Sequence, residues 1–278
     1  MVKRPHGVAH REFNWQRVDW TPDLHPGEIH LWLLNKNILE TLLYHPAFKA
    51  VLNDTEIYRA SHIVDREKRE LYIAGRIGLR LLLQKYIGQV AGEIEFLYGL
   101  RGKPSLGVNS DGCELHFNYA VSSGHAFYGF SYDCELGVDL EIYPRNINVK
   151  SFVRRILSSE EQKAWASISK SDKNNAMLCC WTRKEAYGKL LGVGIRYNMQ
   201  QSELFFDLEN DHWSSKVSGL FVEDHSRIAS RVYGVQVGLP ASGAASIMYD
   251  NVTGHDSDYK INHPDILAFE PFGNFWRR

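Results

Sequence analysis

The longest helical pattern in the chain, at residues 63–88, restricts the possible folds more than any other feature of the sequence. Its apolar residues Ile73, Ile77 and Leu81 recur every four positions, as in a helix that buries one face. A second helical pattern covers residues 174–194, and the two patterns contain the similar segments YIAGRIGLRLLL and WTRKEAYGKLLG. Irregular sequence precedes each pattern, and strand-like segments follow it. This order is consistent with two similar halves that meet near residue 135.

The composition is that of an ordinary globular protein, with 44% hydrophobic and 23% charged residues among 278. A formal net charge of −1 does not suggest binding to nucleic acid or to a membrane through basic residues. No segment approaches the about 18 apolar residues of a membrane span, and the first residues lack the apolar core of a signal peptide. With the four cysteines as reduced thiols, we expect a cytoplasmic monomer without nucleic-acid or membrane partners. We expect the segment after residue 240 to lie against the body of the protein.

Two carboxylates, Asp139 and Glu141, alternate with apolar residues in the strand pattern LGVDLEI at 136–142. Alternate residues of a strand point to the same face, so both acids face away from the apolar side. A half-solvated edge strand shows the same alternation, and this interpretation stays open. A hard divalent cation would remove the repulsion between the two acids, and Mg²⁺ takes such oxygen ligands. Gly137 marks a position where a ligand or another backbone can approach closely.

Glu185 is the candidate for a third acidic ligand. It lies one helical turn from both Trp181 and Lys189, so the three side chains share one helix face. Trp181 is expected to pack the helix onto a sheet. The face would then offer one acid for a metal and one amine for a phosphate. An exposed Glu–Lys pair without function has the same spacing, so both interpretations stay open.

GVDLE at 137–141 is followed about forty residues later by WTRKEAYGK at 181–189, while RGKPSL at 101–106 and Phe117-Asn118 lie upstream. Together these motifs resemble the signature of the 4′-phosphopantetheinyl transferases, in their large, pseudo-dimeric class. The resemblance covers about residues 60–200, and the two later motifs are the specific ones. It implies an α+β fold of two similar α/β halves in a pseudo-twofold arrangement. We place the halves at residues 1–135 and 136–278.

The resemblance implies transfer of 4′-phosphopantetheine from coenzyme A to a serine of an apo acyl or peptidyl carrier protein, with release of 3′,5′-ADP. The implied cofactor is Mg²⁺, with Mn²⁺ as an alternative, and the carriers would belong to polyketide or nonribosomal peptide synthases, as in antibiotic biosynthesis. The implied metal ligands are Asp139, Glu141 and Glu185. The implied catalytic residues are Glu185, as general base, and Lys189. The implied coenzyme contacts, in a cleft between the halves, are Arg76, Arg80, Lys103, Pro104, Ser122 and Lys189.

Two details stay open within this resemblance. Arg76 and Arg80 share one face of the first helical pattern and suit phosphate groups, but a solvated basic face has the same spacing. The family's central motif usually reads F-N-x-S-H-S, whereas this chain reads FNYAVSSGH from Phe117. Val121 occupies the histidine position without a gap, and Ser122 occupies it after a one-residue insertion. We therefore assign the pyrophosphate contact to no histidine.

Two other functions also stay open. Another Mg²⁺-dependent phosphoryl or nucleotidyl transferase could use the same carboxylates, but the chain has neither G-x-x-x-x-G-K-[ST] nor G-x-G-x-x-G after a strand. A non-catalytic homologue that binds coenzyme A or a carrier protein would explain the missing histidine. The three acids and Lys189 favour the enzyme instead.

Overall fold

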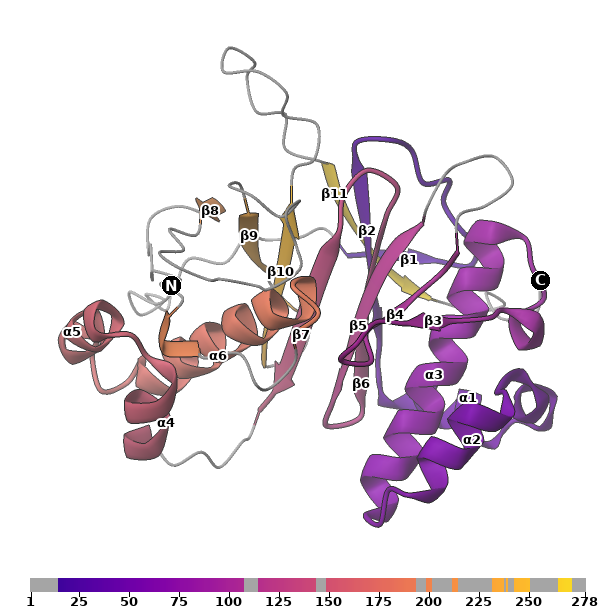
Figure 1. Cartoon of the computed structure of the whole chain (residues 1–278), viewed down its shortest axis with the longest axis horizontal. Coiled ribbons are helices and arrows are strands. Elements are labelled where there is room, and N and C mark those ends of the chain that lie inside the picture. The colour runs from indigo at the N-terminus through magenta and orange to yellow at the C-terminus, as the bar shows by residue number, and fades with distance from the viewer. Residues whose placement is uncertain are drawn as a thin grey trace.

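Two β-sheets pack against each other at the centre of the molecule, and one long helix covers the outer face of each sheet (Figure 1). This computed structural model describes residues 15–107, 115–143, 149–193, 199–201, 212–214, 232–237, 239, 243–250 and 265–271. The architecture confirms the α+β class and the two similar halves, since each half consists of a sheet and its long helix.

The first sheet has five strands in the order β1-β11-β2-β6-β5. The bounds are β1 (Gln16–Val18), β2 (Glu28–Leu34), β5 (His116–Ser122), β6 (His125–Ser131) and β11 (Asp265–Pro271). The pairs β2–β6 and β5–β6 are antiparallel, whereas β11 runs parallel to both of its neighbours. Ser123 (φ 44°) and Gly124 (φ 75°) form the turn between β5 and β6, in the left-handed conformation that a two-residue hairpin turn favours.

The first helical pattern forms α3 (Arg66–Ile87), inside the expected residues 63–88. Asp65 caps its N-terminus by accepting a hydrogen bond from the amide of Lys68, and Gly88 ends it with φ 70°. The hydroxyl of Tyr128 in β6 donates to the carbonyl oxygen of Gly75 at 2.9 Å, which fixes α3 on the sheet. The shorter helices of this half are α1 (Lys36–Tyr44), η1 (Pro46–Val51), α2 (Asp54–Ser61) and η2 (Ala91–Glu93).

A short hairpin follows α3 and carries the G-K-P element. Its strands are β3 (Leu97–Tyr98) and β4 (Pro104–Ser105). The amide of Gly102 donates to the carbonyl oxygen of Gly99 at 2.8 Å, and Gly102 adopts φ 83°, which favours glycine. The tight loop brings the side chain of Lys103 to the second half of the molecule, where it reaches Leu190.

The second sheet has four antiparallel strands in the order β7-β10-β9-β8. The bounds are β7 (Leu136–Ile142), β8 (His212–Ser214), β9 (Val232–Val237) and β10 (Gly243–Asp250). The second helical pattern forms α6 (Lys173–Leu190), which packs on β7 and β10. The other helices of this half are α4 (Val149–Ile156), α5 (Ser159–Ser167) and η4 (Met199–Gln201). Of the helices that the structure describes, none has the length and apolar character needed to cross a membrane.

A buried apolar cluster joins the two sheets. Leu136, Val138 and Leu140 of β7 pack in it with Leu31 of β2 and Phe127 of β6. At the edge of this interface, β5 lies beside β7, although the two strands belong to different sheets. The halves therefore meet along a continuous core, and the β5–β7 edge is where polar groups of both halves come together.

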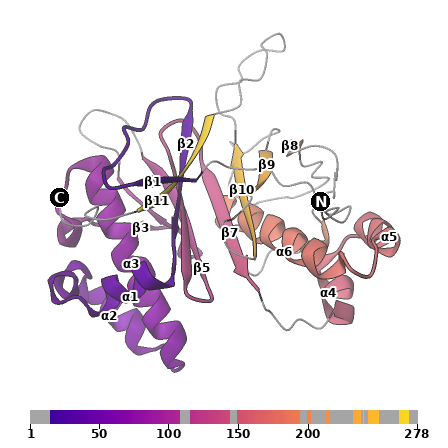
Figure 2. The same ribbon diagram turned by 180° about the vertical axis from the view of Figure 1, so that it is seen from behind.

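The last described strand departs from the division at residue 135. Strand β11 pairs in parallel with β2, and the ring of Phe269 packs 4.9 Å from that of His30 and 5.1 Å from that of Trp32. Figure 2 shows β1, β11 and β2 side by side. The described parts of the segment after residue 240, β10 and β11, thus lie within the two sheets, as expected of a segment that lies against the body. Strand β11 does not lie with the C-terminal half, to which the division assigned it, because it completes the first sheet.

Candidate active site

Helix α6 lies unusually close to strand β7, and Gly137 makes this approach possible. A Cβ atom at Gly137 would lie 2.1 Å from the carbonyl oxygen of Ala186 and 2.4 Å from the amide nitrogen of Leu190. Gly137 was expected to allow the close approach of a ligand or of another backbone, and here it is the backbone of α6 that approaches. Asp139 and Glu141 share the face of Gly137 and so point toward α6. They are only 6% and 8% exposed, so the half-solvated strand interpretation is wrong.

Lys189 joins the helix to the first of these acids. Its Nζ donates to Oδ1 of Asp139 at 2.8 Å and to the carbonyl oxygen of Val138 at 3.0 Å. The carboxylate of Asp139 is nearly buried, whereas the Lys189 side chain is 28% exposed. The ammonium can therefore reach solvent or a ligand while it neutralises a buried charge.

Glu141 is held by donors from both halves of the molecule. The hydroxyl of Ser122, at the end of β5, donates to Oε2 at 2.9 Å. The indole N–H of Trp181 in α6 donates to Oε1 at 3.1 Å. Trp181 packs against the apolar cluster that includes Val232 of β9 and Met248 of β10, as expected of a residue that packs α6 onto a sheet, and it also orients this carboxylate. The hydroxyl of Ser122 therefore orients Glu141, and its expected contact with the coenzyme stays a prediction.

The side chain of Glu185 lies on α6 between those of Trp181 and Lys189, whose partners are Glu141 and Asp139. Glu185 therefore shares the face of α6 from which Trp181 and Lys189 contact the two β7 acids, and it is half-buried. Three hard oxygen donors on one seam fit Mg²⁺ or Mn²⁺ in their chemistry. Within the described ranges, no three His, Cys, Asp or Glu side chains are gathered closely enough to hold a metal ion. In this structure Lys189 donates to Oδ1 of Asp139, and Ser122 and Trp181 donate to the two carboxylate oxygens of Glu141.

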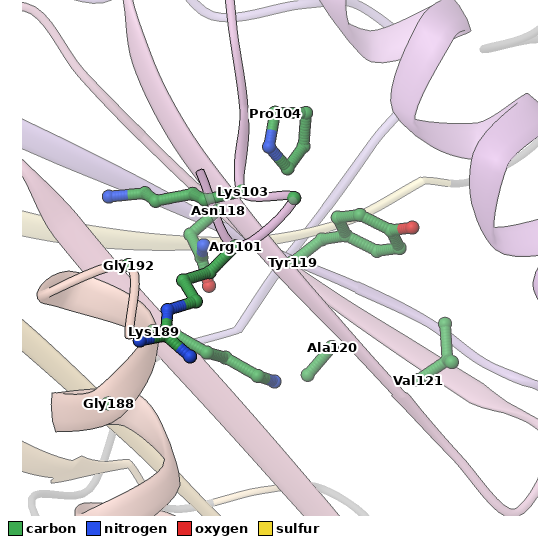
Figure 3. A pocket seen from close by; sticks show the side chains of 11 residues that line it. Arg101, Lys103, Pro104, Asn118, Tyr119, Ala120, Val121, Gly188, Lys189 and Gly192 are labelled. Atoms are coloured by element: carbon green, nitrogen blue, oxygen red, sulfur yellow. The ribbon is translucent and has the colours of Figure 1, made fainter. Parts of the chain in front are cut away.

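An open pocket of 380 Å³ lies beside this seam (Figure 3). Its walls come from the β3–β4 loop, from β5 and from the end of α6, and hence from both halves. Its lining residues are Arg101, Gly102, Lys103, Pro104, Asn118, Tyr119, Ala120, Val121, Gly188, Lys189 and Gly192. The expected coenzyme contacts Lys103, Pro104 and Lys189 all lie here. The basic side chains gather near the end of α6, whereas Tyr119, Ala120 and Val121 follow β5 on the other side.

Arg101 and Asn118 line the pocket, although the sequence interpretation assigned neither a contact with the coenzyme. Arg101 adds a third basic side chain, and its position just before Gly102 and Lys103 was the available signal. Asn118 belongs to the Phe117-Asn118 motif, and its Oδ1 accepts a hydrogen bond from the amide of Val138 at 3.0 Å. This bond ties β5 to β7, so the motif asparagine fixes the pocket wall against the acid-bearing strand.

The structure corrects the expectation that Arg76 and Arg80 contact a phosphate group. They are 2% and 0% exposed and do not line the pocket. Their Nε atoms donate to the two carboxylate oxygens of Glu56, at 2.5 Å and 2.7 Å, and Arg80 also donates to the carbonyl oxygens of Ala91 and Ile94. The solvated-face alternative is wrong as well, because α2 and η2 cover this face of α3. The two guanidinium groups stabilise the fold of the first half.

Comparison with known proteins agrees with this geometry. The family model of the 4′-phosphopantetheinyl transferase superfamily matches residues 135–237, which contain the three acids and Lys189. The 4′-phosphopantetheinyl transferase HetI of Nostoc sp. is 33% identical over 168 residues, or 60% of this chain and 70% of HetI. The Synechocystis sp. protein slr0495, provisionally named for the same activity, is 28% identical over 56% of this chain and 63% of its own length. The L-aminoadipate-semialdehyde dehydrogenase-phosphopantetheinyl transferase of Xenopus laevis is 24% identical over 63% of this chain and 66% of its own length.

Proposed function

Because this chain belongs to the 4′-phosphopantetheinyl transferase superfamily, we propose that it transfers 4′-phosphopantetheine from coenzyme A to a serine of an apo carrier protein. The observation that carries the proposal is the seam between β7 and α6. It holds Asp139 and Glu141 opposite Glu185 and Lys189, directly beside a pocket with basic residues at its rim. Acidic groups for a cation next to basic groups for phosphates are what a pyrophosphate substrate requires.

In the proposed reaction, the serine hydroxyl oxygen attacks the phosphorus atom that carries pantetheine. A P–O bond to serine forms, and the bond from this phosphorus to the bridging oxygen of the pyrophosphate breaks, so that 3′,5′-ADP leaves. Glu185 accepts the serine proton, directly or through a water molecule, because it is half-buried and lies on the α6 face between Trp181 and Lys189, which contact the two β7 acids. Lys189, Lys103 and Arg101 contact phosphate oxygens and orient them for in-line attack.

Asp139, Glu141 and Glu185 are the residues that would hold Mg²⁺ or Mn²⁺ in this proposal. The bound cation would neutralise charge that develops on the pyrophosphate oxygens. Lys189 then has a second role, because its ammonium donates to Oδ1 of Asp139 and orients this carboxylate toward α6. The hydroxyl of Ser122 and the indole of Trp181 orient the carboxylate of Glu141.

We further propose that the acceptors are carrier domains of polyketide or nonribosomal peptide synthases. This proposal rests on the resemblance to the large, pseudo-dimeric class.

A second candidate function is binding of coenzyme A without transfer. Val121 in the pocket wall favours it, because Val121 takes the position of the family histidine when the motifs are aligned without a gap, and a valine offers no polar contact to a pyrophosphate. Retention of Glu185 and Lys189 at the seam supports the transferase.

Intact-mass spectrometry of an apo carrier protein, incubated with this enzyme, coenzyme A and Mg²⁺, tests the proposal. The expected result is a carrier heavier by one phosphopantetheine, with the gain blocked by EDTA. Glu185→Gln should slow transfer by at least about 100-fold, as expected for loss of a general base. The matched control is Glu160→Gln, because Glu160 forms an exposed pair with Lys163 on α5. No gain with several carriers, despite binding of coenzyme A, would favour the non-catalytic function.

The metal ligands are tested by Asp139→Asn. Titration calorimetry of coenzyme A with and without Mg²⁺ should show tighter binding with Mg²⁺ for the wild type and a much smaller difference for the variant. An unchanged Mg²⁺ dependence in Asp139→Asn would remove Asp139 from the ligand set.

A further inference from the structure

The side chain of Lys103 connects the two halves at the rim of the pocket. It comes from the β3–β4 loop of the first half, and its Nζ lies 2.5 Å from Oε2 of Glu135 and 3.2 Å from the carbonyl oxygen of Leu190. Glu135 directly precedes β7 and Leu190 ends α6, so both acceptors belong to the second half. A lysine side chain is long and flexible, and two acceptors restrict it far more than one.

Glu135 is itself held in place. Oε1 of its carboxylate lies 3.6 Å from Nδ1 of His116, and its carbonyl oxygen accepts a hydrogen bond from the amide of Asp250 at 3.2 Å. Burial alone would raise the pKa of Glu135, but the hydrogen bond from His116 and the charge of Lys103 outweigh it and lower the pKa to about 2. The carboxylate is therefore ionised at neutral pH and presents one oxygen to each partner.

The placement of Glu135 relative to the pocket decides what the pair can do. Lys103 lines the pocket, whereas Glu135 does not. Glu135 thus contacts the ammonium from outside the pocket lining, with a side chain that is 41% exposed against 19% for Lys103. An ammonium has three N–H donors, and two acceptors contact it among the residues that the structure describes. A third N–H can then be directed into the pocket.

We propose that Glu135, supported by His116, is a positioning residue that holds the Lys103 ammonium at the pocket rim, ready for a phosphate group. The identity of that phosphate, as part of coenzyme A, rests on the proposed function. The advantage is preorganisation, because Lys103 follows the Gly99–Gly102 turn and would otherwise sample many rotamers in solvent. Glu135 acts only through Lys103 and touches no substrate atom.

The first test needs no ligand. Acylation of lysines with acetic anhydride, quantified by peptide mass spectrometry, reports how well Lys103 is shielded. Glu135→Gln keeps the size of the side chain and removes its charge, and it should speed acylation of Lys103 by about three- to fivefold, the range of a partly exposed ion pair. Glu160→Gln, which removes the exposed partner of Lys163, should leave Lys103 unchanged. An unchanged rate at Lys103 in a folded Glu135→Gln variant would overturn the proposal.

The second test uses transfer kinetics. Glu135→Gln should raise KM for coenzyme A by about three- to fivefold and leave kcat within about twofold, because only ligand positioning is lost. In a Lys103→Met background the same substitution should have no further effect on KM. An equal increase in both backgrounds would show that Glu135 acts structurally and would overturn the proposal. If the wild type transfers nothing while acylation of Lys103 still responds to Glu135→Gln, the proposed function fails and the positioning of Lys103 stands.

Discussion

The ammonium of Lys189 lies 2.8 Å from Oδ1 of Asp139 and thereby links the helix and the strand that carry the candidate active site. The same nitrogen donates to the carbonyl oxygen of Val138, the residue whose amide is bound by Asn118. Strand β7 is thus held from two sides at one position, by α6 and by β5. The acids that follow Val138 owe their orientation to both halves of the molecule.

Removing the Lys189 ammonium should destabilise the protein as well as impair transfer. Lys189→Met leaves the nearly buried carboxylate of Asp139 without its cation, which we expect to lower the free energy of unfolding by about 1–3 kcal/mol. Urea denaturation measures this loss. Adding Asp139→Asn to Lys189→Met should recover most of it, because the unpaired charge is then removed. Lys163→Met, at an exposed pair on α5, is the control and should change stability by less than about 0.5 kcal/mol. Equal losses for both lysines would contradict a special role for the Asp139 pair.

The seam between β7 and α6 could be predicted largely from sequence, because its information is local. Alternation placed Asp139 and Glu141 on one strand face, and helical spacing placed Glu185 beside Lys189. Spacing alone could not show that these two faces meet. The family motifs supplied that step, and the structure gives its physical reason in Gly137, where only a hydrogen atom fits beneath the α6 backbone.

The basic residues of α3 could not be assigned from sequence for the opposite reason. Helical spacing shows that Arg76 and Arg80 share a face, but their partner Glu56 lies on α2, a separate helix. Likewise, nothing in the β11 sequence predicts its parallel pairing with β2. This pairing joins strands that lie far apart in the sequence, so it depends on the tertiary fold. The burial of Lys184 against Glu161 could not be predicted from sequence either, because it depends on where α5 packs.

The close contact at Gly137 gives a second prediction. In Gly137→Ala the new methyl group would overlap the backbone of α6, which cannot move aside as a flexible side chain can. We expect a loss of at least about 3 kcal/mol in the free energy of unfolding, the upper range for an overpacked core. Gly107→Ala is the matched control, because a Cβ there meets no atom within 4 Å. Similar urea midpoints for the two variants would show that α6 does not lie as close to β7 as described.

The buried Glu56 cluster gives a third prediction. Glu56→Gln leaves two buried guanidinium groups without a counter-charge, which should cost about 3–5 kcal/mol of stability. Affinity of the folded variant for coenzyme A, measured by calorimetry, should stay within about twofold, because Arg76 and Arg80 lie outside the pocket. Glu40→Gln, at the exposed Lys36–Glu40 pair, controls for loss of a surface charge. Weakened coenzyme binding with unchanged stability would return the two arginines to the list of phosphate ligands.

A buried histidine makes stability depend on pH between about 6.5 and 4. His30 is 0% exposed, and its Nδ1 lies 2.8 Å from the hydroxyl of Tyr86. Burial lowers its pKa to about 4, against an opposing effect of Glu28. The pKa of His30 in the folded protein lies below the unfolded value of 6.5. Burial of the neutral imidazole therefore contributes fully to the free energy of unfolding above pH 6.5, and this contribution is lost as the pH falls toward 4.

His30→Asn removes this titration, so its stability should fall less steeply than that of the wild type across this window. Urea denaturation at several pH values measures the free energy of unfolding of both proteins. The difference between the wild type and His30→Asn should narrow by at most about 1.4 kcal/mol per pH unit as the solution is acidified. The carboxylates titrate in both proteins, so they cancel in the difference. His62→Asn, at an exposed histidine after α2, is the control for the effect of the substitution itself. If the free energies of unfolding of the wild type and His30→Asn depend on pH in the same way, the pKa of His30 is not lower in the folded protein than in the unfolded chain.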